Sequence, residues 1–585
     1  MTTALAFDRF PTYAELTGVL ERWRDEHTGS MSLESLGRSH EGRDIWLVTV
    51  TDPATGDPAD KPALWIEANI HSVELTGSLA ALHLVHRLLS GGPDDERIER
   101  VRRTRTVYVV PRLNPDGAEA ALGHPPRFVR SSVRQWPAPW PRPEPELRGV
   151  LEGDIDGDGR ILDMRVADPH GPWKADPDEP RLLVAREPDE EGEGPYYRLL
   201  PEGEVHDYDG LVIPGAREPA GLDLNRNWPM EWAPESDQHG AGPYPTSEPE
   251  VAAAVAAMAG RPNICLYVAY HTYGGVHLRP WSAHPDEKFP TFDLRVYQDL
   301  GKRLSRITGY RNASVFHDFK YDLHKTEAGA SDDWAYDHLG VLAWTWELWS
   351  IVSEAGIGDD HHLIEWYNDH PDSDDRALLA WADEHAPGAF VDWYPFHHPQ
   401  LGPVELGGWH ALEAWVNPPS TRREAEAAKV TEAAVFCALI TPRLEVGPTR
   451  VERVSGEDGG EGPQTWRIRV VVVNSGWLPT NVTERAVQRK AVRPVTAILA
   501  PGEGVHRAGG RDEVELGQLA GRALKRNTTR WDRDVTTDRA VAEWIVTGPR
   551  GAEVQVELRH QRAGTCTVRL HLEESGEFEP REEET

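Results

Sequence analysis

The pattern of apolar and polar positions predicts an α/β fold over the first part of the chain. Apolar residues at helical spacing from Pro11 to about Glu26 predict an amphipathic helix. Apolar runs further on predict strands over residues 44–51, 63–70, 104–114, 263–270 and 341–348, with helices over 74–89 and 293–307. Because such alternation is typical of a sheet covered by helices, we expect a largely parallel or mixed sheet.

Two regions depart from this alternation. Prolines, acidic residues and glycines dominate from about Ser131 to Pro219, so we expect a long, irregular insertion of the kind that borders functional sites. After about Gly407, short apolar runs alternate with turn residues, which is typical of a β-sandwich. We therefore predict an α/β domain over residues 1–406, with the insertion at about 131–219, and a β-rich accessory domain over residues 424–575.

The charge balance narrows the classes of partner. The 585 residues include 62 Lys and Arg against 96 Asp and Glu, a formal net charge of −34. This excess of negative charge argues against nucleic acid as a partner and leaves cationic or zwitterionic substrates open. No apolar stretch is long enough to predict a membrane span. Three cysteines without a CxxC pair, and no apparent secretory signal, lead us to expect a cytoplasmic protein.

Residues able to bind a metal follow two predicted strands. His71 and Glu74 come directly after strand 63–70, and their spacing can place both on one side of a turn. His271 follows strand 263–270, and Glu347 lies in an apolar strand where a carboxylate is unexpected as structure. Because parallel strands end at one edge of a sheet, these side chains could converge there. Taken alone, a histidine at the end of a strand is usually a surface or core residue.

A fourth segment, GLDLNRNWP, carries polar side chains that suit an anion. Arg226 could bind a carboxylate through two N–H groups, and Asn225 adds a further donor. An ordinary loop would also account for this pair. Asn225 comes 108 residues after Gly117, at the far side of the insertion.

Eight sequence blocks in a fixed order resemble the zinc carboxypeptidases of the carboxypeptidase A/B type. The blocks are GRSHEGRDIW (37–46), His71 with Glu74, RLNPDG (112–117), LDLNRNW (222–228), TSEPE (246–250), HTY (271–273), SDDWAYDHLG (331–340) and WTWEL (344–348). They span more than half of the chain. The resemblance implies a mixed-sheet zinc-carboxypeptidase-like domain, here with a long irregular insertion and followed by a β-sandwich-like C-terminal domain.

The resemblance also implies a role for each matching residue of the catalytic centre. His71, Glu74 and His271 would bind Zn²⁺ and leave one coordination position open. Glu347 would be the general base, and Arg130 would stabilise the negative charge that develops on the substrate oxygen.

Further matching residues would surround the substrate. Asn225 and Arg226 would hold the C-terminal carboxylate of a peptide, Tyr273 would line the cleft, and Asp223 would orient the ring of His71. Asp332 stands at the position that lines the base of the specificity pocket, where an acid favours a basic C-terminal residue.

Two positions differ from the pattern of the digestive members. Val73 replaces an arginine, which changes the surroundings of the upstream peptide residues. Lys325 occupies the position of a mobile tyrosine over the substrate, so that this clamp is either absent or supplied by Tyr321.

An acidic loop inside the insertion suggests a second cation. Asp154, Asp156 and Asp158 alternate before Gly159, as at the start of an EF-hand loop that binds Ca²⁺. The twelfth position is Arg165 in place of the usual glutamate. A solvated acidic turn is an equally good interpretation.

The sequence thus predicts zinc-dependent hydrolysis of C-terminal residues from peptides, with a preference for basic residues. One alternative is a hydrolase of small acyl-amino acids, and another is a peptide-binding protein that has lost catalysis. Peptides are the expected partners, nucleic acid and membrane are not, and no feature of the sequence identifies a protein partner.

Overall fold

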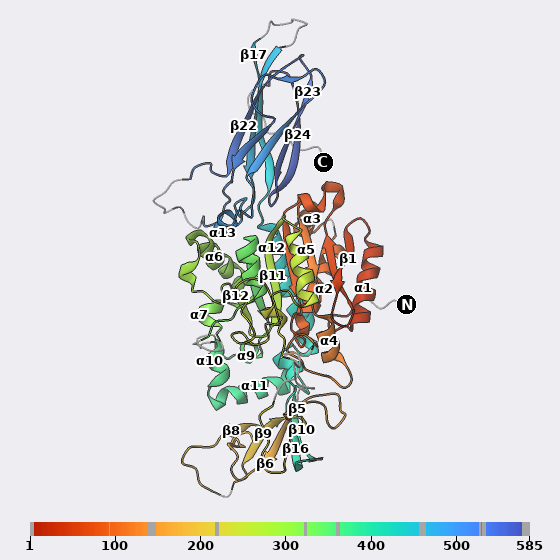
Figure 1. The fold of residues 1–585 in the computed structure, drawn as a ribbon, viewed down its shortest axis with the longest axis vertical. Coiled ribbons are helices and arrows are strands. Elements are labelled where there is room, and N and C mark those ends of the chain that lie inside the picture. Colours follow the sequence, from red (N-terminus) through yellow and green to blue (C-terminus); the bar gives the residue numbers. More distant parts are fainter. Residues whose placement is uncertain are drawn as a thin grey trace.

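The computed structural model describes residues 5–92, 94–134, 136, 148–192, 194–216, 221–320, 325–358, 363–455, 464–525, 528 and 534–575. An α/β region forms the middle of an elongated molecule, with a small lobe of strands at one end and a β-sandwich at the other (Figure 1). Among the helices in these residues, none is long and apolar enough to cross a bilayer.

The α/β region is built on one eight-stranded mixed sheet in the order β1–β2–β4–β3–β11–β14–β12–β13. Its strands are β1 (Met31–Arg38), β2 (Asp44–Val50), β3 (Ala63–Ala68), β4 (Thr106–Val110), β11 (Ile264–Thr272), β12 (Val276–Arg279), β13 (Arg311–Ser314) and β14 (Leu342–Leu348). Strands β4, β3, β11 and β14 are parallel neighbours. Strand β2 pairs antiparallel with β1 and β4, and β12 pairs antiparallel with β14 but parallel with β13. The predicted mixed-sheet α/β fold is confirmed.

Helices precede, separate and follow the strands of this sheet. They are α1 (Tyr13–Glu26), α2 (Leu75–Ser90), α3 (Glu96–Thr104), α4 (Pro115–Leu122), α5 (Pro249–Ala259), α6 (Thr291–Thr308), α7 (Val315–Asp318), α8 (Ser331–Trp334), α9 (Ile351–Glu354), α10 (Leu363–Asn368), α11 (Asp372–His385) and α12 (Ser420–Leu439). Helix α1 begins where its sequence predicts, because the Thr12 and Glu15 side chains each accept a hydrogen bond from the other's backbone N–H.

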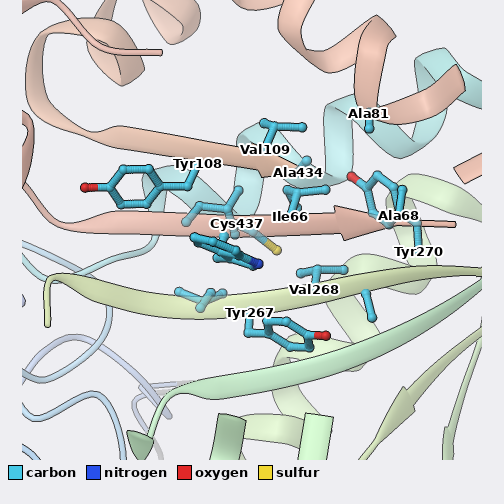
Figure 2. Packing of buried hydrophobic residues seen from close by; sticks show 14 of the residues in the cluster. Ile66, Ala68, Ala81, Tyr108, Val109, Tyr267, Val268, Tyr270, Ala434 and Cys437 are labelled. Atoms are coloured by element: carbon cyan, nitrogen blue, oxygen red, sulfur yellow. The ribbon is translucent and has the colours of Figure 1, made fainter. Parts of the chain in front are cut away.

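Helix α12 belongs to the core of the α/β region. It packs against α2 and β3, and Figure 2 shows Ala434 and Cys437 beside Ile66. The second core begins only at Leu444. The predicted start of the accessory domain at residue 424 therefore falls inside a helix of the first core. A change in the pattern of apolar and turn residues along the sequence locates a domain boundary only roughly.

The insertion contains short strands that the sequence did not reveal. They are β5 (Gly149–Glu152), β6 (Asp163–Ala167), β7 (Trp173–Ala175), β8 (Leu183–Ala185), β9 (Tyr197–Pro201) and β10 (Gly203–His206). Four of them join β15 (Phe390–His398) and β16 (Gly402–Trp409) in a sheet ordered β15–β16–β6–β9–β7–β8, while β10 pairs with β5. The insertion and a distant hairpin thus form one lobe, labelled at the bottom of Figure 1.

Two four-stranded antiparallel sheets enclose the second core. One is β17 (Leu444–Ser455), β18 (Gln464–Asn474), β22 (Arg539–Gly548) and β20 (His506–Arg507), and the other is β21 (Glu513–Gly517), β19 (Val495–Pro501), β23 (Glu553–His560) and β24 (Gly564–His571). A short helix, α13 (Glu484–Gln488), precedes β19. Strand β18 alternates buried and half-buried residues along its length, as a strand facing one core should. The predicted β-sandwich is confirmed.

Candidate active site

Three parallel strands bring the predicted catalytic side chains to one edge of the central sheet. His71 and Glu74 follow the end of β3, and His271 lies at the end of β11. Glu347 lies on β14 directly opposite His271 in the strand register. The shared direction of the strands therefore assembles a site from residues more than 270 positions apart in sequence.

Asparagine side chains fix the loop after β3. Asn69 adopts a left-handed conformation with φ 60°, and its Nδ2 donates to the carbonyl of His71 at 2.7 Å. Nδ2 of Asn114 donates to the carbonyls of Ile70 at 3.1 Å and Ser131 at 2.7 Å. Asn114 therefore links the loop carrying His71 to the segment that contains Arg130 and Ser131.

The three predicted metal ligands converge. His71 Nδ1 lies 2.7 Å from Glu74 Oε1, and His271 Nδ1 lies 3.2 Å from His71 Nδ1 and 3.1 Å from Glu74 Oε2. Ligands at about 2.0–2.2 Å from one tetrahedral zinc ion lie about 3.3–3.6 Å apart, so this set is close to zinc-binding geometry. All three residues are buried. Two imidazole nitrogens and one carboxylate also form a donor set that suits zinc.

Asp223 contacts His71, and Arg130 contacts Asp223 and Glu74. Asp223 Oδ1 lies 3.2 Å from His71 Nε2, which fixes the ring and leaves Nδ1 free for a metal. Burial disfavours the ionised form of Asp223, but the charge of Arg130, whose Nε donates to Oδ2 at 3.1 Å, holds its pKa well below the usual value. Burial also opposes ionisation of Glu74, yet His71 and His271 lower its pKa. The Glu74 carboxylate is therefore ionised.

Glu347 is a buried acid that still reaches the pocket. Its exposed fraction is 8%, and it lines the same pocket as His71, His271 and Arg130. Burial raises its pKa to about 8. Arg130 is more accessible, with 44% of its side chain exposed. A carboxyl group with a raised pKa beside a cluster of metal ligands is suited to exchange protons with a substrate.

The pocket continues toward the predicted substrate-binding residues. Asn225, Arg226 and Asp332 all line it. Oδ1 of Asn225 accepts from the backbone N–H of Ser331 at 2.9 Å, which leaves Nδ2 as a donor. Asp332 is 2% exposed, its Oδ2 has no hydrogen-bond partner in the described part of the chain, and burial raises its pKa.

A neighbouring pocket shares part of its lining with the first. Tyr273 and Val73 line it, together with His71, Glu74, Arg130 and Glu347. Tyr367 and Val416, which sequence reasoning missed, complete its apolar wall. Lys325 is exposed, and the alternative clamp residue Tyr321 lies outside the described residues.

Sequence reasoning also missed Glu327, a further acid lining the first pocket. It follows Lys325 and Thr326, precedes the run Ala328–Ala330, and belongs to no motif of its own. Only its place four residues before Ser331 could have drawn attention to it.

The acidic loop gives no support for calcium. Asp158 forms an ion pair with Arg160, and the third carboxylate near Asp154 and Asp156 is instead Glu202. The oxygens of Asp154 and Glu202 accept backbone N–H groups of the loop, at 2.7–2.9 Å. Hydrogen bonds within the loop account for these acids without a cation, as the interpretation of a solvated acidic turn expects.

Comparison with family models divides the chain into two parts. The model described as "Zinc carboxypeptidase" (Peptidase_M14) matches residues 16–136 and 204–355. The model described as "Domain of unknown function (DUF8731)" matches residues 443–571, which is the β-sandwich. The break between the two carboxypeptidase segments coincides with most of the insertion.

Individual relatives are distant. A zinc carboxypeptidase of Saccharothrix mutabilis subsp. capreolus is 18% identical over 64% of this chain and 70% of its own length. Carboxypeptidase A2 of Rattus norvegicus is 24% identical over 57% of this chain and 61% of its own length. The crystal structure of thrombin activatable fibrinolysis inhibitor aligns with a TM-score of 0.42 at 14% identity, covering 74% of each chain.

The eight-stranded sheet and the three converging side chains of His71, Glu74 and His271 lie within the segments that match the carboxypeptidase model. Residues 16–136 and 204–355 belong to the zinc carboxypeptidase family, Peptidase_M14.

Proposed function

We propose that this chain is a zinc-dependent carboxypeptidase of the A/B type that removes C-terminal residues from peptides. The observation that carries the proposal is the convergence of the His71, Glu74 and His271 ligand atoms beside one pocket. That pocket is also lined by Glu347, Arg130, Asn225 and Arg226, so a base, cations and amide donors share it.

Each residue has a distinct task in the proposed reaction. Zinc, when bound by His71, Glu74 and His271, supplies Lewis acidity. Glu347 takes a proton from the attacking water at its carboxylate and later delivers it to the leaving amine. Arg130 donates to the carbonyl oxygen as it becomes negative. Arg226 and Asn225 hold the terminal carboxylate, which restricts cleavage to the last residue.

We further propose a preference for C-terminal Lys or Arg, which rests on Asp332. Its carboxylate is almost fully enclosed and has an unpartnered oxygen in the described structure. A basic side chain entering the pocket would pair with that oxygen and favour its ionised form, and such a pair is stronger in an enclosed site than in water.

A peptide assay combined with metal analysis tests the proposed function. The purified full chain is expected to hold one zinc per molecule and to shorten peptides from the C-terminus, with activity lost on chelation and restored by zinc. A peptide of the same sequence with an amidated C-terminus should be cleaved far more slowly, because Arg226 has no carboxylate to bind. Equal cleavage of the two peptides, or preferential hydrolysis of acyl-amino acids, would contradict the proposal.

Asp332→Lys is expected to reverse the residue preference. The measurement is kcat/KM on three peptides that differ only in a final Arg, Phe or Glu. The parent should favour Arg and the variant Glu, because the charge facing the side chain changes sign. An unchanged ranking would remove Asp332 from the specificity pocket.

A further inference from the structure

The guanidinium that would hold the substrate carboxylate already has a carboxylate partner within the chain. Arg226 Nε lies 2.6 Å from Glu327 Oε2, and the two side chains are 12% and 27% exposed. Nη1 of Arg226 donates to the carbonyl of Asn225 at 2.9 Å. Both Arg226 and Glu327 line the pocket that contains Asp332 and Glu347. A substrate carboxylate would therefore compete with Glu327 for the N–H groups of the Arg226 guanidinium.

The loop carrying Glu327 packs closely on Arg226. Gly329, with φ +72°, lies so near that a Cβ there would come within 2.3 Å of the Arg226 carbonyl oxygen. The Gly329 carbonyl accepts from the N–H of Trp228 at 3.0 Å, and Gln238 Oε1 accepts from the N–H of Ala328 at 3.1 Å. Backbone contacts therefore place Glu327 beside the guanidinium, and the ion pair does not depend on two freely moving surface side chains.

We infer that Glu327 is a built-in competitor for Arg226 and thereby sets how tightly the pocket binds a C-terminal carboxylate. The inference rests on the proposed function, in which Arg226 is the carboxylate-binding residue. A bidentate clamp needs two N–H groups of the guanidinium on one side, and Glu327 takes one of them. The incoming carboxylate must displace Glu327 and is repelled by its charge until it does.

The competitor also favours one class of substrate. Glu327, Asp332 and Glu347 are three acids lining a pocket whose lining includes two arginines, Arg130 and Arg226. A peptide ending in Lys or Arg compensates the excess acid, whereas a peptide ending in Asp or Glu adds to it. Glu327 thus weakens binding of the carboxylate common to all substrates, and its negative charge adds to the preference for a basic C-terminal side chain.

The test compares Glu327→Gln with the parent, using the zinc-loaded full chain. For a peptide ending in a free Arg, KM should fall by about tenfold while kcat changes by less than about twofold, because a charged competitor for the guanidinium is removed. KM for the amidated peptide should not change. Glu287→Gln removes the same charge from a side chain that is 78% exposed, and it should leave both peptides unaffected.

A binding measurement separates this inference from the proposed function. The affinity of zinc-free protein for N-acetyl-arginine, measured by calorimetry, should rise about tenfold in Glu327→Gln, and the gain should vanish when Arg226→Ala is added. A parent that cleaves no peptide, with this gain in affinity intact, would refute the proposed function but leave the competition in place. An unchanged or weaker affinity in both Glu327→Gln and Glu327→Ala would overturn the inference, since Glu327 would then merely hold Arg226 in position.

Discussion

Glu347→Gln is expected to lower kcat by about 10²- to 10⁴-fold while the zinc content stays at that of the parent. Glutamine has the shape of glutamate but cannot take a proton from water, and Glu347 is not among the three clustered ligand residues. Burial raises the pKa of Glu347 to about 8, which means that the fold disfavours its ionised form. The amide should therefore not destabilise the protein.

Glu67→Gln is the matched control for this experiment. Glu67 is also a buried glutamate of the central sheet, with a pKa raised by burial to about 7, but it bonds to the Tyr267 hydroxyl at 2.6 Å. The kcat of the Glu67→Gln variant should stay within about tenfold of the parent value. Turnover near the parent level in a folded, zinc-loaded Glu347→Gln protein would show that the base lies elsewhere.

The position of the metal-ligand cluster could be predicted because its residues follow the apolar runs that form the strongest elements. The strands before His71 and His271, and the strand containing Glu347, are fully buried along their length. Parallel strands with such runs end at one edge of the sheet, so the order of motifs in sequence was enough to bring the three residues together.

Other motifs of the resemblance have structural roles that the sequence could not show. Asp116 accepts from the Ser39 hydroxyl and the Glu41 N–H, both at 2.7 Å, and Glu250 accepts from the N–H of His40 at 2.9 Å. These contacts join three blocks that are 75–210 residues apart. The sequence alone identified these blocks, but only the fold shows that they form hydrogen bonds with one another.

The strands of the insertion and the pairing of Glu327 with Arg226 could not be predicted from the sequence, for different reasons. Strands of three to five residues, such as β7, are too short for an alternating pattern, and the lobe pairs with the distant strand β16. Glu327 is one of 96 acids, and nothing in its neighbours marks it. Its importance comes from its distance to Arg226, which is a property of the folded chain alone.

Asp337→Ala is expected to lower the free energy of unfolding by about 3 kcal/mol, because it breaks two ion pairs that join the α/β region to the C-terminal region. Asp337 lies in the π-helical turn that follows α8, and its side chain is fully buried. Each of its carboxylate oxygens pairs with an arginine of the C-terminal region, Arg485 or Arg489. Removing the acid leaves two guanidiniums facing a site without a counter-charge, although the partial exposure of Arg489 reduces the cost.

Guanidinium denaturation of the full chain, followed by tryptophan fluorescence, measures this effect. Glu543→Ala is the control, since it removes an acid from the exposed pair with Arg469 and should change the free energy of unfolding by no more than about 0.5 kcal/mol. Asp337→Asn keeps oxygen and nitrogen atoms in place and should fall between the two, because it retains an acceptor but loses the charge. A midpoint for Asp337→Ala equal to that of the parent would mean that the two arginines are satisfied by solvent and that other contacts hold the sandwich in place.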